Sequence, residues 1–129
     1  DSRLRHLCEQ LSAPGSLIQR FTPNGADIDA VFDVRAIVQQ GHRDLDIEAL
    51  PPLLLPRKGK HGLKDYEKVF CPDLKTGPDI FDLRGIDRDN GCIVVVRPDQ
   101  YVADVLPLEA VAALQSYFSS FMISQNASA

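Results

Sequence analysis

An α/β domain is predicted by features near the end of the 129-residue chain. Cys92 to Val96 is an uninterrupted, mostly β-branched apolar run, which is typical of a strand buried on both faces inside a sheet. Arg97-Pro98-Asp99-Gln100 predicts a turn, because proline fixes φ and aspartate can hydrogen-bond its own backbone. Tyr101 to Val105 predicts the returning strand of a hairpin, with one face formed by Tyr101, Ala103 and Val105 and the other by Val102 and Asp104.

A helix is expected to follow this hairpin directly. Pro107 suits a first helical turn, where a missing N–H costs nothing, and Glu109 places negative charge near the positive helix end. Apolar residues then recur at spacings of three and four, which predicts a stripe formed by Val111, Leu114, Phe118 and Phe121, with Met122 beside it. Such a helix can cover one face of the hairpin. This β-β-α ending is typical of several α/β folds, the thioredoxin-like fold among them.

The composition describes an ordinary globular domain. Hydrophobic residues make up 44% of the chain and charged residues 25%, and the length is that of one domain. A net charge of -4 argues against a nucleic-acid partner, because a phosphate backbone requires a surplus of Lys and Arg. No apolar run is long enough to predict a membrane span, and the charged N-terminus lacks a signal-peptide core. We therefore expect a cytoplasmic protein that contacts no membrane.

The N-terminal third predicts helices first and a strand later. Asp1 to Leu11 has the pattern of an amphipathic helix, and the absence of an initiator Met before it indicates a piece of a longer chain. Ser16 to Phe21 fits a short helix or a strand, and we favour the helix. Ala30 to Gln39 alternates in character and predicts a strand. Asp46 can cap a short helix over residues 47–50 that ends before Pro51.

The middle of the chain predicts short extended pieces and loops. In order, we expect an extended segment over Leu53 to Leu55, a strand over Tyr66 to Phe70, a helical turn over Ile80 to Leu83 and a polar turn over Asp87 to Gly91. The domain is expected to span residues 1–123, and the small polar residues 124–129 are expected to form a flexible tail.

No catalytic constellation is visible. The nucleophile-elbow, zinc-protease, P-loop and dinucleotide-binding motifs are all absent from the sequence. His6, His42 and His61 have no ligand-spaced partners and are expected to be surface histidines. Three cysteines without a C-x-x-C pair indicate reduced thiols, of which Cys71 is the candidate for reactivity because it follows an expected strand. Neither a catalytic residue nor a metal or cofactor ligand is predicted.

Three blocks of sequence resemble a known family. They are LPRKGKHGLKDYEKVF at 55–70, DIFDLRGIDRDNG at 79–91 and VVVRPDQYVADVLPL at 94–108. Together they are similar to the C-terminal domain of the phenol 2-monooxygenase family of FAD-dependent aromatic hydroxylases, which includes 3-hydroxybenzoate 4-monooxygenases. The resemblance implies a thioredoxin-like, three-layer α/β fold with a central mixed sheet. It also implies that the redox cysteine pair is missing, as it is here, and that a first strand precedes the N-terminal helix, which this chain lacks.

The resemblance also implies an accessory role. In this family, FAD, NADPH and the phenolic substrate bind to N-terminal domains of the same chain. We therefore expect residues 1–129 to pack on those domains and to support a homodimer, the whole enzyme being a monooxygenase. A basic, glycine-containing loop is expected over residues 57–62, Arg57-Lys58-Gly59-Lys60-His61-Gly62. The candidate contact residues, chosen for charge and exposure, lie in this basic loop and at the hairpin: Arg57, Lys58, Lys60, Arg97, Asp99 and Tyr101.

Two other functions are compatible with the sequence. The β-β-α ending and Cys71 are compatible with an independent thiol-dependent redox protein of thioredoxin or peroxiredoxin type, although no partner thiol is near Cys71 in sequence. A free-standing ligand-binding module is also possible, but it leaves the three family-like blocks unexplained.

Overall fold

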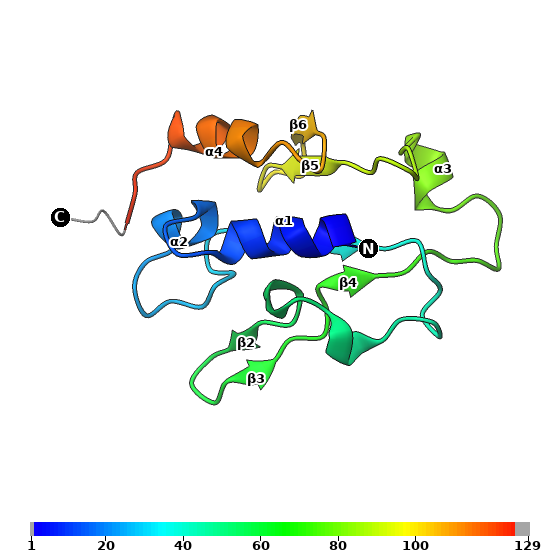
Figure 1. Cartoon of the computed structure of the whole chain (residues 1–129), viewed down its shortest axis with the longest axis horizontal. Coiled ribbons are helices and arrows are strands. Elements are labelled where there is room, and N and C mark those ends of the chain that lie inside the picture. The colour runs from blue at the N-terminus through cyan, green and yellow to red at the C-terminus, as the bar shows by residue number, and fades with distance from the viewer. Residues whose placement is uncertain (1, 126–129) are drawn as a thin grey trace.

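The chain folds into a mixed α/β domain in which helix α1 lies at the centre. A computed structural model describes residues 2–125. In Figure 1, α1 crosses the middle of the view, with α4, β5 and β6 above it and β2, β3 and β4 below it. The elements in chain order are α1 (Ser2–Ser12), α2 (Leu17–Phe21), β1 (Ala36–Ile37), η1 (Ile47–Ala49), η2 (Pro52–Leu54), β2 (Arg57–Lys58), β3 (Leu63–Lys64), β4 (Val69–Phe70), α3 (Ile80–Arg84), β5 (Ile93–Val96), β6 (Val102–Leu106) and α4 (Val111–Ser119).

The hydrophobic core surrounds α1. This helix contacts α2, η2 and α4, so residues far apart in sequence share one apolar cluster. The buried members of the cluster are Leu7, Cys8, Leu11, Leu17, Ile18, Phe21, Ala36, Leu53, Leu54, Val111 and Leu114. The inward residues of β5 and β6 pack against the same cluster. The core therefore joins both ends of the chain.

Most predicted helices are present. The apolar residues Leu4, Leu7, Cys8 and Leu11 lie in α1, and Leu17–Phe21 form the short helix α2 rather than a strand. Asp46 caps η1, because its Oδ1 accepts a hydrogen bond from the Glu48 N–H at 3.1 Å. The predicted helical turn at 80–83 is α3, which is capped by Asp79 at its start and by Gly85, in the left-handed conformation, at its end.

The extended segments are shorter than predicted. Of the strand predicted over residues 30–39, only Ala36 and Ile37 pair, and of the strand over 66–70 only Val69 and Phe70 pair. These four residues form the parallel pair β1–β4. The alternating pattern overestimated both strands because a strand also needs a backbone partner, and these two segments meet over two residues each.

The prediction of an extended Leu53–Leu55 segment was wrong. Pro52 to Leu54 form a 3₁₀ turn, in which the Leu54 N–H donates to the Pro51 carbonyl at 2.9 Å. Proline fixes φ at a value that suits the first position of a helical turn, so Pro52 starts a turn here instead of holding the chain extended.

The predicted β5–β6 hairpin is confirmed, but two of its details were wrong. Strand β5 is not buried on both faces, since Val94 and Val96 are exposed. A β-bulge between Val95 and Val96 shifts the register, so that Val94 pairs with Val105 and Val96 with Val102. The extra residue in β6 places Val102 and Val105 on one face, where strict alternation had placed them on opposite faces.

The closing helix begins later than predicted. Residues 107–110 form a separate turn, in which the Ala110 N–H donates to the Pro107 carbonyl at 3.0 Å, and α4 starts at Val111. Its predicted stripe is confirmed at Val111 and Leu114, which are buried, and Phe118 is partly buried against the core. Phe121 lies beyond the end of the helix and is exposed.

Among residues 2–125 the strands form three separate two-stranded pairs, one parallel and two antiparallel. Of the predicted tail, Gln125 donates its backbone N–H to the Arg20 carbonyl at 2.8 Å, and residues 126–129 lie outside the described residues.

Candidate interaction site

The predicted basic loop is an ordered hairpin. Arg57 and Lys58 of β2 pair with Lys64 and Leu63 of β3. Arg57 Nη1 donates to the Gly62 carbonyl across the turn at 3.1 Å. The Gly59 N–H donates to both carboxylate oxygens of Asp27, at 3.1 and 3.2 Å. Lys60 is exposed at the tip of this hairpin.

Lys58 points away from the tip and takes part in a charged cluster. Its Nζ lies 2.8 Å from Asp29 Oδ2 and 3.4 Å from Asp65 Oδ2. Of the three basic candidates, Arg57 and Lys60 are therefore exposed, while Lys58 is engaged inside its own domain.

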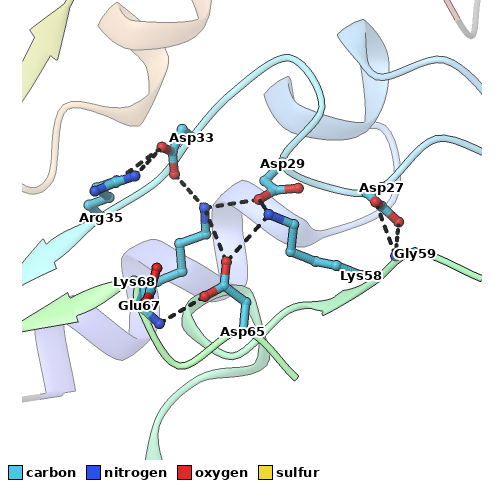
Figure 2. A network of polar contacts seen from close by, with 9 residues as sticks. All are labelled: Asp27, Asp29, Asp33, Arg35, Lys58, Gly59, Asp65, Glu67 and Lys68. Carbon is cyan, nitrogen blue, oxygen red and sulfur yellow. Dashed lines mark hydrogen bonds and ion pairs between the residues drawn. The ribbon is translucent and has the colours of Figure 1, made fainter. Parts of the chain in front are cut away.

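The centre of that cluster is Lys68, which sequence reasoning did not single out. Its side chain is 5% exposed, and its Nζ lies 2.6 Å from Asp33, 2.9 Å from Asp29 and 3.7 Å from Asp65. Arg35 also binds Asp33, at 2.9 Å. Figure 2 shows these groups converging from the loop before β1, from strand β2 and from the segment between β3 and β4.

The charges of the cluster hold each other ionised. Burial opposes the charged form of Asp29, but hydrogen bonds from Lys58 and Lys68 outweigh it and lower the pKa of Asp29 below its usual value. Burial likewise opposes the charge of Lys68, and hydrogen bonds to Asp33 and Asp29 raise its pKa above the usual value. Asp33 has a lowered pKa because bonds from Lys68 and Arg35 outweigh its burial.

The cluster is suited to structure rather than to catalysis. A lysine whose pKa is raised stays protonated near neutral pH, so it can act neither as a base nor as a nucleophile. The three carboxylates that contact Lys68 are paired with three cations, Lys58, Lys68 and Arg35, so each of these charges already has a partner within the domain. Two sequence signals could have indicated the cluster: Lys68 inside an expected strand, and the closely spaced Asp27, Asp29 and Asp33.

The other candidate contact residues lie at the β5–β6 turn. Arg97 Nη2 lies 2.6 Å from Asp99 Oδ2, and both side chains are largely exposed. Tyr101 is 70% exposed beside them. The structure therefore presents Arg97, Asp99 and Tyr101 together on the surface, at a different element from Arg57 and Lys60.

Two strand pairs turn apolar residues away from the core. In β1–β4, Ile37 and Phe70 are exposed while Ala36 and Val69 pack inward. A shallow hollow beside this pair is lined by Ile37, Phe70, Cys71, Pro72, Asp73, Thr76, Pro78, Asp79, Ile80 and Leu83. In β5–β6, the exposed residues are Val94, Val96, Val102 and Val105.

The remaining groups give no catalytic centre within residues 2–125. Among them, no set of three or more His, Cys, Asp or Glu side chains is arranged to hold a metal ion. Cys8 is buried, and Cys71 and Cys92 are partly exposed, all three as free thiols. The helices of this part of the chain are also all too short or too polar to cross a membrane.

An α/β domain with exposed apolar strand faces, and with its nearly buried ion cluster paired internally, is suited to packing against another protein surface. A comparison with known protein families shows which family of such domains this chain belongs to. Residues 1–126 match the family model described as phenol hydroxylase, C-terminal dimerisation domain, and the chain belongs to this family.

Two relatives extend this finding. The chain is 60% identical over 124 residues to a 3-hydroxybenzoate 4-monooxygenase of Comamonas testosteroni, an alignment that covers 95% of the chain and 19% of the relative. It is 29% identical over 124 residues to the FAD-dependent monooxygenase terD of Aspergillus terreus, covering 94% of the chain and 20% of that protein. The chain thus spans about a fifth of the length of both relatives. The family membership gives no support to the thiol-dependent redox alternative.

Proposed function

We propose that this chain is the C-terminal accessory and dimerisation domain of an FAD-dependent aromatic monooxygenase. The parent enzyme would hydroxylate a phenolic ring with NADPH as the reductant, bind FAD and substrate in N-terminal domains, and form a homodimer through this domain. The observation that carries the proposal is the family match over residues 1–126, together with 60% identity to a 3-hydroxybenzoate 4-monooxygenase. Three free cysteines fit the reducing cytoplasm, which is the compartment we propose.

The start of helix α3 does not fit the pyrophosphate of FAD. A dinucleotide pyrophosphate binds the free N–H groups of a helix that follows a strand and a glycine-rich turn. Helix α3, which follows β4, already has its N-terminal amides bonded to the Asp79 carboxylate, at 3.0 Å for Phe81 N and 3.2 Å for Asp82 N. A phosphate would meet this negative charge. We therefore assign FAD and NADPH to the rest of the parent enzyme.

The thioredoxin-like arrangement is the second part of the proposal. The parallel β1–β4 pair, the β5–β6 hairpin and the closing helix α4 are compatible with one mixed sheet, provided that a further strand of the parent enzyme joins the pairs. A crystal structure of the full-length enzyme tests this arrangement. Strand pairs that remain separate there would contradict it.

Deletion of this domain from the full-length enzyme tests the dimerisation role. We expect the deletion protein to sediment as a monomer and to keep its flavin absorbance, because FAD binds elsewhere in the chain. The undeleted enzyme, measured at the same concentration, is the control. A deletion protein that remains a dimer would refute the dimerisation role.

The exposed candidate contacts need a separate test. Alanine variants of Arg57, Lys60, Arg97 and Tyr101 in the full-length enzyme should weaken assembly wherever the side chain lies in a contact. The exposed surface charge of Arg84 on α3 offers a comparison variant. Unchanged sedimentation, flavin content and turnover in all four variants would show that the contact assignment is wrong.

A further inference from the structure

The outer face of the β5–β6 hairpin is a compact apolar surface. We call it the valine face and define it as Val94, Val96, Val102 and Val105. These side chains are 44, 54, 60 and 56% exposed, respectively. The register Val94–Val105 and Val96–Val102 places them side by side as two cross-strand pairs. Asp104 pairs with Val95 on the opposite face, so the strands add no charged side chain to the valine face.

Such a face is expected to be covered in the assembled protein. An antiparallel sheet with one solvated face normally carries polar residues there. The β2–β3 hairpin of the same domain follows this rule, because three of its four strand residues are Arg57, Lys58 and Lys64. Strand β5, in contrast, has the apolar run of a strand buried on both faces, yet only its inward face meets the core. The missing cover must come from another surface.

The family description as a dimerisation domain favours a second copy of this chain as that cover, and the local charges do not oppose it. Each copy has a net charge of -4, so two copies repel each other unless they meet where like charges are absent. The valine face meets this condition. At its turn end, Arg97 and Asp99 form an ion pair at 2.6 Å, so this end is neutral and does not repel its symmetry mate. Two flat β-branched faces can pack directly, as in sheet-on-sheet contacts about 10 Å apart.

We propose that the valine face is the apolar centre of a two-fold contact between two copies of this domain. This inference rests on the proposed dimerisation function and specifies its surface. A stable interface buries about 800 Å² on each partner, so four valines form its centre and not its whole extent. The exposed Tyr101 and Arg97 lie at the turn end of the same hairpin and would belong to its rim.

A charge placed in the valine face tests the proposal. Val102→Asp in the full-length enzyme would bury an unpaired carboxylate in the contact, and we expect the dimer dissociation constant to rise on the order of a hundredfold. Leu74→Asp is the matched control, because Leu74 is 66% exposed in the loop after β4, outside the valine face and away from the candidate contacts on both hairpins. This control should leave the dissociation constant unchanged. Sedimentation equilibrium measures both variants.

Two further samples make every outcome decisive. Val102→Thr keeps the side-chain shape but replaces a methyl group by a hydroxyl, so it should weaken the dimer while the circular dichroism spectrum of the folded protein stays unchanged. This variant tests the contact if Val102→Asp does not fold. The deletion protein reports on the dimerisation function itself. A monomeric deletion protein together with undisturbed dimers of both Val102 variants would overturn the valine-face contact and leave the proposed function standing. A dimeric deletion protein would refute the function and this inference together.

Discussion

Lys68 connects the loop before β1 with its own segment, between β3 and β4, through a single ammonium group. Its partners Asp29 and Asp33 come from the loop before β1, and Asp65 comes from the segment after β3. A buried charge without partners is costly, whereas one surrounded by carboxylates is retained. We infer that the cluster fixes the loop and the β2–β3 hairpin against strand β4.

Replacement of Lys68 should therefore destabilise the folded domain. We expect Lys68→Met to lower the free energy of unfolding by about 3 kcal/mol, because the nearly buried Asp29 and its neighbours lose a cation. Lys64→Met is the matched control, since Lys64 pairs at 3.2 Å with the exposed Glu48 and should cost less than about 1 kcal/mol. Urea denaturation of both variants measures the difference. Equal losses would show that the cluster adds no more than a surface ion pair.

The same cluster predicts how stability depends on pH. The folded pKa values of Asp29, Asp33 and Asp65 lie below the unfolded value of about 3.9. Their stabilising contribution is thus complete above about pH 5 and is lost as the pH falls through the folded pKa values. Lys68 has a raised pKa, so its contribution is complete below about pH 9 and is lost at more alkaline pH, above its usual pKa of about 10.4.

Unfolding free energies measured between pH 3 and pH 7 check the acid side of this prediction. We expect stability to fall below about pH 4 in the native protein, and to fall less steeply in Lys68→Met, where the carboxylates have lost their main partner. If the unfolding free energies of the two proteins fell equally steeply below pH 4, the loss of stability in acid could not be assigned to this cluster.

Among the elements, the β5–β6 hairpin depends on an unusual turn. Gln100 has a φ of 73°, in the left-handed region that favours glycine, and its N–H donates to the Arg97 carbonyl at 2.9 Å. A side chain there costs about 1–2 kcal/mol of backbone strain. The turn tolerates this cost because the hairpin packs its inward face on the core.

Gln100→Gly should consequently stabilise the hairpin. We expect a gain of up to about 1 kcal/mol in the free energy of unfolding, since relief of strain exceeds the extra entropy of glycine in the unfolded chain. Gln100→Ala is the control and should give little change, because alanine keeps the Cβ atom. Thermal unfolding of the two variants compares them. A destabilising glycine would mean that the Gln100 side chain stabilises the turn.

On the scale of the whole molecule, one core joins the first helix to the last. Cys8 lies in it with 2% exposure, and burial raises the pKa of its thiol to about 11, a rise that Arg5 opposes and Glu9 supports. Because the thiolate is the reactive form, Cys8 should react only when the core opens.

Thiol labelling tests this expectation. In the native protein, Cys71 and Cys92 should react with a thiol reagent well before Cys8, and Cys8 should react at a rate that follows global unfolding. Cys8→Ser removes the slow phase and identifies it. Fast labelling of Cys8 under native conditions would show that α1 opens independently of the rest of the core.

The sequence by itself determined the positions of the longer helices, of the β5–β6 hairpin and of one helix cap, and it indicated the family. Helical periodicity located α1 and most of α4, and it favoured a helix over a strand at α2. Turn chemistry located the β5–β6 hairpin, and Asp46 was correctly identified as a cap. Each of these signals depends on neighbours within a few residues. The absence of catalytic motifs and the three family-like blocks indicated an accessory domain, and the family match confirmed the resemblance.

Only the tertiary structure decided how the segments meet. Strand lengths at β1 and β4 depend on a backbone partner more than thirty residues away. The bulge that gathers the valine face is a property of pairing and not of alternation. The Lys68 cluster combines charges from three segments whose approach no local pattern encodes. Interactions between residues far apart in sequence are set by the packing of the whole chain. For that reason local sequence patterns did not predict them.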